Sequence, residues 1–230
     1  MTDRVVVFLD ESGTEAGSTR LLVGAVATLD PEGLTQDVDV ARSAIVADST
    51  LWTSDKKRSK FQATGFHHCD DSVTIRDRFV EVIRTLPIRV HVGYAAPDFA
   101  GLGTTRLMSI MYSVLITNII QRYRGLAVEL VFETNSSLNS LYGRIAGHAQ
   151  AEADADSNFK SVVKCVIDGK GTPGLAVIDY CLALVRQGLE AEAGTAQPHE
   201  AGMARRINPQ MAHLVDFERA LHRRKLDRLL

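Results

Sequence analysis

Short apolar segments rich in β-branched residues alternate along this chain with longer segments of helical periodicity. The first two apolar runs, residues 5–9 and 21–29, are separated by a turn-rich segment that contains Gly13 and Gly17. Two such runs joined by a turn predict a β-hairpin. Strand-like and helix-like segments then follow one another. This order predicts an α/β fold in which one mixed sheet carries helices on both faces.

Apolar runs and capping residues place the remaining elements. Strands are predicted at residues 88–94, 126–132 and 159–167, which makes a five-stranded sheet with the hairpin. Helices are predicted from Pro31, from Asp70 or Asp71, over 104–124, from Asn135 or Ser136, over 173–188, and from Asn208 to the C-terminus. Residues 53–65 are predicted to be a loop or a short edge strand, and residues 190–206 a loop. We expect one α/β domain over residues 1–190, with an inserted helical and loop segment at about residues 30–69. A loop and a C-terminal helix follow over residues 191–230.

Composition and charge exclude several classes of protein. Apolar residues make up 45% of the chain and charged residues 23%, which is ordinary for a globular protein. The 26 basic and 28 acidic residues give a net charge of -2, which excludes nucleic-acid binding through bulk charge alone. The N-terminus lacks the pattern of a signal peptide, and the apolar stretch 107–120 is too short to cross a bilayer. We therefore expect a protein that does not bind membranes. The three cysteines form no C-x-x-C pair, which predicts a reduced, cytoplasmic protein.

Three carboxylates stand in apolar surroundings. Asp10 and Glu133 each end a predicted strand, and Asp179 lies inside the apolar segment 175–184. Burying an isolated carboxylate is costly unless it is paired, protonated or bound to a metal. Each acid taken singly has an ordinary explanation, as a strand-end group that faces water or as part of a solvent-facing helix stripe. Because ligands gather at the carboxyl ends of parallel strands, three such acids together favour a shared site.

Two short motifs carry a resemblance to a known family. The sequence Phe-Leu-Asp-Glu-Ser-Gly at residues 8–13 resembles the opening motif of the bacterial domain-of-unknown-function family 3800. The sequence Gly-Leu-Ala-Val-Ile-Asp at residues 174–179 resembles its closing helix, which more commonly reads Gly-Leu-Gln-Leu-Ala-Asp. Phe66-His67, Asp70-Asp71 and Arg76 resemble its middle section. The resemblance covers residues 5–186 and implies a ribonuclease H-like fold.

The resemblance also implies a function, a divalent-metal-dependent nuclease that hydrolyses phosphodiesters of DNA or RNA. Asp10, Glu133 and Asp179 would hold Mg²⁺ or Mn²⁺, hard cations that prefer oxygen ligands. Two such ions about 4 Å apart activate a water and stabilise the leaving oxygen. The helix 104–124 lacks the carboxylate that proteins of this fold usually carry there, so Glu11 or Asp168 is the candidate for a further catalytic carboxylate.

The alternative is an inactive ribonuclease H-like protein that binds nucleic acid or another protein, in bacterial defence or mobile-element biology. The lack of a carboxylate in the helix 104–124 favours this alternative, whereas the three acids in apolar surroundings, Asp10, Glu133 and Asp179, favour the nuclease. A panel of DNA and RNA incubated with Mn²⁺ separates the two.

Three other features have both a functional and an ordinary interpretation. His67 could transfer a proton or contact phosphate, or it could simply precede a helix. Zinc binding by His67-His68-Cys69-Asp70 is disfavoured, because adjacent residues rarely coordinate one ion and no second pair follows at zinc-site spacing. The basic run Lys56, Lys57, Arg58 and Lys60 is a candidate contact for a nucleic-acid backbone, or a solvated loop. The final helix could pack on the domain, form a homodimer or contact nucleic acid, and we favour packing or dimerisation.

Overall fold

A six-stranded mixed sheet forms the centre of the protein. The computed structural model describes residues 4–15, 17–155, 160–169, 171–195 and 197–223. The strand order is β5-β4-β1-β2-β3-β6. The strands are β1 (Arg4–Ser12), β2 (Leu21–Thr28), β3 (Ile88–Ala95), β4 (Ala127–Glu133), β5 (Val162–Asp168) and β6 (Met211–Asp216).

Strand directions confirm the predicted hairpin and the mixed sheet. β2 pairs in antiparallel fashion with β1 and β3, whereas the pairs β1–β4, β4–β5 and β3–β6 are parallel. The carboxyl ends of β1, β4 and β5 therefore meet at one edge of the sheet. The α/β fold class with helices on both faces is confirmed, and the predicted number of strands is corrected from five to six.

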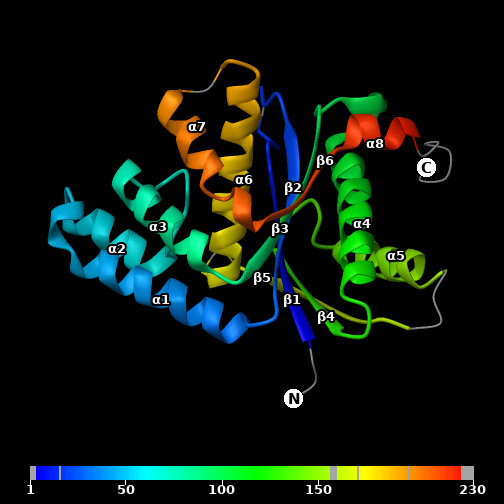
Figure 1. Ribbon diagram of the computed structural model, residues 1–230, viewed down its shortest axis with the longest axis horizontal. Helices are drawn as coiled ribbons and strands as arrows, with labels where there is room; N and C mark the ends of the chain where they lie inside the picture. The colour runs from blue at the N-terminus through cyan, green and yellow to red at the C-terminus, as the bar shows by residue number, and fades with distance from the viewer. Residues whose placement is uncertain (1–3, 16, 156–159, 170, 196, 224–230) are drawn as a thin grey trace.

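Helices cover both faces of the sheet (Figure 1). One face carries α1 (Pro31–Ala47), α2 (Asp55–Thr64), α3 (Val73–Thr85), α6 (Pro173–Glu192) and α7 (Pro198–Arg205). The other face carries α4 (Thr104–Arg122), α5 (Tyr142–Asp154) and α8 (Phe217–Arg223). Short 3₁₀ turns lie at η1 (Ser49–Leu51), η2 (Phe99–Gly101) and η3 (Asn208–Gln210).

Coverage of both faces explains why β1 is apolar without interruption. Val5, Val7 and Leu9 enter the core beneath α4 and α5, whereas Val6 and Phe8 enter the core beneath α6. Successive side chains of a strand point to opposite faces, so a strand in this position needs apolar residues at every step. Asp10 comes next on the α6 face, two residues after Phe8.

The segment predicted as a loop or a short edge strand over residues 53–65 instead contains the helix α2. Ser54 caps its first turn, where the Ser54 Oγ accepts a hydrogen bond from the Lys57 amide at 3.4 Å. Gly65 ends the helix with a φ of 75°, a conformation that glycine adopts without strain. Only Phe61 of this helix is buried, so its sequence has almost no apolar stripe. The apolar periodicity by which helices were predicted is therefore absent here. The following helix α3 is capped by Ser72, not by Asp70 or Asp71.

The C-terminal region also differs from its prediction. The expected loop at residues 190–206 contains α7, and the expected helix from Asn208 is replaced by η3, β6 and α8. β6 adds the sixth strand by pairing with β3, about 120 residues earlier in the chain, and only such tertiary pairing selects strand over helix here.

The short helix α8 packs on the domain. Phe217 at its start contacts Gly93 of β3, where an added Cβ would lie 2.1 Å from the ring. The proposed dimer contact falls partly on residues 224–230, which lie outside the described part of the chain. Among the described residues, no helix combines the length and apolar character needed to cross a membrane.

His91 of β3 makes the stability depend on pH. Its side chain is 3% exposed, and burial, with Arg122 of α4 and His213 of β6, lowers its pKa from 6.5 to about 4. Between these pH values the unfolded chain binds a proton that the folded chain does not. The free energy of unfolding therefore falls with decreasing pH, by up to about 1.4 kcal/mol per pH unit. Urea unfolding of His91→Phe between pH 7 and 4 should show a smaller slope than the wild type. His148→Asn, at an exposed position of α5, should keep the wild-type slope, and an equal slope in His91→Phe would contradict the prediction.

Candidate metal and nucleic-acid site

Asp10 and Glu133 lie side by side near the carboxyl ends of two parallel strands, with Asp10 two residues before the end of β1 and Glu133 the last residue of β4. Leu9 of β1 is paired with Phe132 of β4, so Asp10 and Glu133 follow at the next level of the sheet. Their side chains are 6% and 8% exposed. Both face α6, because the preceding side chains on that face, Phe8 and Val131, pack in the core beneath this helix. Two predicted site residues are thereby brought together.

The electrostatics at Asp10 are those of an acid crowded by other acids. Burial raises the pKa of Asp10 well above its usual value, and the charges of Glu133, Glu11 and Asp179 raise it further. A hydrogen bond with Glu133 acts in the same direction. The Asp10 Oδ1 accepts a hydrogen bond from the Glu11 amide at 2.7 Å. Within the described ranges, no lysine or arginine forms an ion pair with Asp10.

Asp179 reaches the same place from α6. Its side chain is 28% exposed, and its Oδ2 accepts a hydrogen bond from the His68 amide at 2.8 Å. The same oxygen lies 3.7 Å from the His67 Nδ1. Its charge contributes to the raised pKa of Asp10, after the charges of Glu133 and Glu11. The apolar neighbours of Asp179 are explained by the burial of α6 on almost all sides.

Glu11 adjoins this cluster but is held on the other face of the sheet. It accepts hydrogen bonds from the hydroxyl of Tyr112 on α4 and from the side-chain amide of Asn135. Burial, followed by the charge of Glu11, raises the pKa of the Tyr112 hydroxyl well above its usual value, so this hydroxyl remains a donor. The helix α4 thus contributes a phenol, and not a carboxylate, beside the cluster.

Asp168 lies at the level of Glu133 but is used by the turn before α6. Its backbone is paired with that of Glu133 in the β4–β5 register. Its Oδ1 accepts a hydrogen bond from the Gly169 amide at 2.8 Å, and its Oδ2 accepts one from the Thr172 hydroxyl at 2.7 Å. These bonds fix the start of α6, so Asp168 has a structural role in the turn that carries Asp179.

The loop at residues 67–71 connects the insertion to α6. The carboxylate of Asp71 accepts hydrogen bonds from the His67 amide at 2.9 Å and from the Tyr180 hydroxyl. Burial raises the pKa of Asp71, and it lowers the pKa of His68 to about 4. Sequence reasoning missed Asp71 and Tyr180 as positioning groups. The sequence feature that could have revealed them is Tyr180, which follows Asp179 in an apolar helix. A buried Tyr hydroxyl needs a hydrogen-bond partner.

Arg186 is a second residue that sequence reasoning missed. It lies seven residues after Asp179 on α6, which places both on the same side of the helix. Its Nη2 donates to the Ser12 Oγ at 2.6 Å and its Nη1 to Glu15 at 2.8 Å, whereas its buried Nε has no hydrogen-bond partner in the described part of the chain. Arg186 thus places positive charge two residues along β1 from Asp10.

The basic run lies on α2, away from the sheet edge. Lys60 pairs with Asp70 at 2.8 Å, and this ion pair is exposed. Lys57 and Lys60 line a cavity of about 360 Å³ together with Trp52 and Phe61, whose ring centroids are 5.3 Å apart. The cavity extends to Asp70 and Asp71. The basic face of α2 is therefore connected to the loop at residues 67–71, and not to Asp10 directly.

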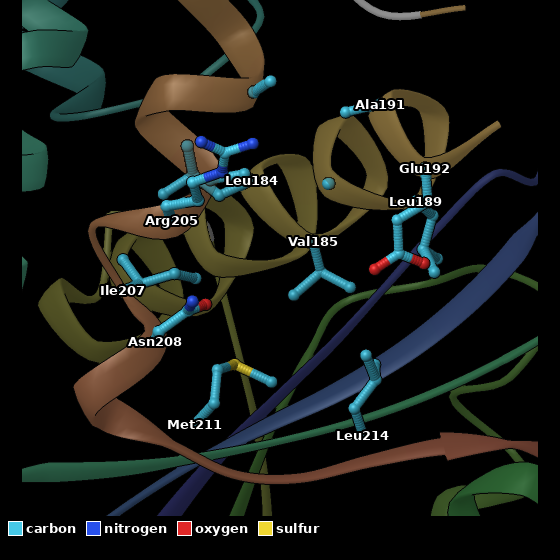
Figure 2. A pocket seen from close by; sticks show the side chains of 13 residues that line it. Leu184, Val185, Leu189, Ala191, Glu192, Arg205, Ile207, Asn208, Met211 and Leu214 are labelled. Atoms are coloured by element: carbon cyan, nitrogen blue, oxygen red, sulfur yellow. The ribbon is translucent and has the colours of Figure 1, made fainter. Parts of the chain in front are cut away.

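A separate cavity of about 390 Å³ lies between α6, α7 and β6 (Figure 2). Its lining is largely apolar and includes Val185, Ile207 and Met211, with Glu192 and Arg205 at its margin. None of the candidate site residues lines it. This cavity therefore belongs to the packing of the C-terminal segment on α6 and not to the carboxylate cluster.

Comparisons with known proteins return structures of low similarity. No protein-family model matches this sequence, and no curated protein matches it. A chain of the PCNA:RNase HII complex from Archaeoglobus fulgidus is 14% identical over 88% of both chains, with a TM-score of 0.47. Ribonuclease H2 from Pyrococcus horikoshii is 12% identical over 83% of this chain and 77% of its own, with a TM-score of 0.42. Bst-RNase HIII in complex with Mn²⁺ is 13% identical over 91% of this chain and 64% of its own, with a TM-score of 0.44.

Proposed function

We propose that this protein is a divalent-metal-dependent phosphodiesterase of ribonuclease H-like type that cleaves DNA or RNA, with Asp10, Glu133 and Asp179 as the metal ligands. The observation that carries the proposal is the environment of Asp10. It is 6% exposed, surrounded by three other acids, and without an ion pair to lysine or arginine among the described residues. Such a group is stable as an anion only if a cation from solution balances it.

The donor set fits a hard cation. Three carboxylates from β1, β4 and α6 offer only oxygen atoms, which Mg²⁺ and Mn²⁺ prefer. When bound, such a cation supplies Lewis-acid activation of a water and stabilisation of the leaving oxygen of the phosphodiester. The raised pKa of Asp10 is consistent with a site in which repulsion between the acids is relieved by a bound cation.

The remaining residues of the site orient these ligands and receive the substrate. The amides of Glu11 and His68 each donate to one ligand carboxylate, Asp10 and Asp179 respectively, and so fix its direction. Arg186 beside Ser12 would contact a phosphate of the nucleic-acid backbone. His67, next to Asp179, would transfer a proton or contact phosphate.

The basic run on α2, Lys56, Lys57, Arg58 and Lys60, would contact the same backbone further from the cleavage point. We also propose membership of domain-of-unknown-function family 3800 and a cytoplasmic location. Each of the two motifs at residues 8–13 and 174–179 contains an acid of the cluster, Asp10 or Asp179. All three cysteines are free thiols, which suits a reducing compartment.

The test is hydrolysis of a panel of single- and double-stranded DNA and RNA in the presence of Mg²⁺ or Mn²⁺. We expect cleavage of at least one class of nucleic acid, complete loss of cleavage in EDTA, and recovery when the cation is restored. No cleavage of any substrate with either cation would contradict the proposed activity.

The alternative is a protein that keeps the fold and binds nucleic acid without cleaving it. One observation favours it: α4 places the Tyr112 hydroxyl, and no carboxylate, beside the cluster, where it holds Glu11 on the far face. The same panel separates the two functions, since stoichiometric binding of a nucleic acid that stays intact with Mn²⁺ would support the binding protein.

A further inference from the structure

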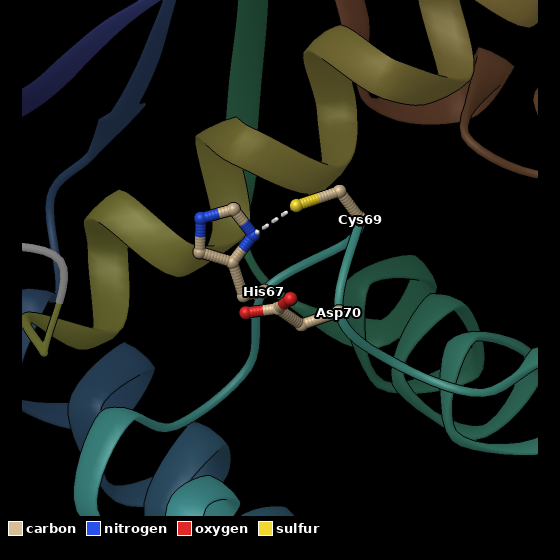
Figure 3. Close-up of side chains that lie close together, drawn as sticks. All are labelled: His67, Cys69 and Asp70. Carbon is tan, nitrogen blue, oxygen red and sulfur yellow. Dashed lines mark hydrogen bonds between the residues drawn. The ribbon is translucent and has the colours of Figure 1, made fainter.

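A second group of side chains with metal-ligating atoms lies next to the carboxylate cluster but differs from it in chemistry. His67, Cys69 and Asp70 each place one donor atom within 4.8 Å of the others (Figure 3). The Cys69 Sγ lies 3.1 Å from the His67 Nδ1, and the two interact directly. Cys69 and Asp70 are exposed and His67 is partly exposed, so an ion from solution can reach the three atoms.

A turn brings these neighbouring residues together. The His67 carbonyl accepts hydrogen bonds from the amides of Asp70 and Asp71, both at 3.0 Å. The His67 amide donates to the Asp71 carboxylate at 2.9 Å. Next to it, the His68 amide donates to Asp179 of α6 at 2.8 Å. The backbone therefore folds back on itself and is anchored to α6, so residues at i, i+2 and i+3 point to one place. The sequence argument against zinc assumed that residues so close in the chain cannot converge, and this turn removes that assumption.

The donor set selects the class of ion. One imidazole nitrogen, one thiolate and one carboxylate suit Zn²⁺ and similar transition metals, whereas Mg²⁺ and Mn²⁺ prefer oxygen alone. Bonds of about 2.0–2.1 Å to nitrogen and 2.3 Å to sulfur in a tetrahedron separate the two donors by about 3.6 Å. The observed separation is 3.1 Å, so a small outward rotation of the exposed Cys69 side chain is sufficient.

We infer that His67, Cys69 and Asp70 form a binding site for one divalent transition-metal ion of the Zn²⁺ class. This inference stands on its own side chains and does not depend on the proposed nuclease activity. The thiol releases its proton on binding, and the ion replaces the Lys60 ammonium, which now pairs with Asp70 at 2.8 Å. The Asp179 Oδ2 lies 3.7 Å from the His67 Nδ1, so this site adjoins the carboxylate cluster.

Titration of Co²⁺ into the reduced, full-length protein tests the site. Co²⁺ bound to a thiolate gives a ligand-to-metal absorption band in the near ultraviolet that oxygen-only coordination does not give. We expect one equivalent to produce this band, and added Zn²⁺ to abolish it. Cys69→Ser should lose the band, and His67→Gln or Asp70→Asn should weaken Co²⁺ binding by about tenfold or more. The folding of each variant is checked by circular dichroism, and these positions are exposed or partly exposed.

Two control variants make the result specific. Cys165→Ser removes the other exposed thiol, on β5, and should leave the absorption band unchanged. Asp10→Asn disables the carboxylate cluster and should also keep the band, which separates failure of this site from failure of the proposed nuclease. Co²⁺ binding without a thiolate band, or an unchanged band in Cys69→Ser, would overturn the inference.

Discussion

Replacing Asp10 by Asn is expected to abolish nuclease activity and at the same time to stabilise the metal-free protein. Activity should fall by at least about a thousandfold, because Asp10 is one of the three proposed ligands of the cation. The free energy of unfolding should rise by about 1–3 kcal/mol, because a buried acid crowded by Glu133, Glu11 and Asp179 is replaced by a neutral amide of the same shape. The amide oxygen can still accept the hydrogen bond from the Glu11 backbone, and the amide nitrogen can donate to Glu133.

The sign of this stability change follows from the pKa. The pKa of Asp10 is raised in the folded protein, so the folded state binds a proton more tightly than the unfolded state. The contribution of Asp10 to stability is therefore full at low pH and is lost as the pH rises through the folded pKa. Urea unfolding without metal at several pH values should show the gain of Asp10→Asn at neutral pH and its disappearance in acid.

Glu129→Gln is the matched control for Asp10→Asn. Glu129 lies on β4, about 13 Å along the strand from Glu133, and pairs with Arg4 and Lys164. This substitution should leave activity unchanged and lower the stability slightly, because it removes favourable ion pairs. If Asp10→Asn were less stable than the wild type at neutral pH, or still active, Asp10 would have a different role.

Replacing Gly174 by Ala is expected to destabilise the protein although alanine favours helices. Gly174 lies in the first turn of α6, and an added Cβ would lie 2.3 Å from the ring of Phe8 on β1. Phe8 is almost fully buried, so the ring or the helix must move, at a cost of about 1–3 kcal/mol. Because α6 carries Asp179 and Phe8 precedes Asp10 by two residues, the same shift should raise the Mn²⁺ concentration needed for half-maximal activity.

Gly147→Ala is the matched helix control for Gly174→Ala. Gly147 lies within α5, where an added Cβ meets no atom within 4 Å. This substitution should stabilise the protein by about 0.5–1 kcal/mol, through the higher helix propensity of alanine. Opposite signs for the two variants, measured by thermal or urea unfolding, would confirm that close packing of α6 on β1 requires Gly174. Equal stabilisation in both would show that α6 does not depend on this contact.

The local pattern of apolar residues was sufficient to predict the strands and helices that are buried on most sides. The apolar runs of β1, β2 and β4 and the apolar helices α4 and α6 are buried on most sides, so the sequence itself predicts them. The same pattern identified Asp10, Glu133 and Asp179 as acids in apolar surroundings. It failed for α2, where Phe61 is the only buried residue, and for β6, whose pairing with β3 joins segments far apart in the chain.

The sequence by itself determined the α/β class, the strands that carry Asp10 and Glu133, and the apolar helix that contains Asp179. Burial of a strand or helix requires apolar residues at regular spacing along it, and this periodic pattern is visible in the sequence. The tertiary structure alone decided that Glu11 is held on the far face by Tyr112, that Asp168 is used by a turn, and that His67, Cys69 and Asp70 converge. The first outcome depends on hydrogen bonds between residues distant in the chain, and the other two depend on tight turns. Neither kind of contact produces a periodic pattern in the sequence.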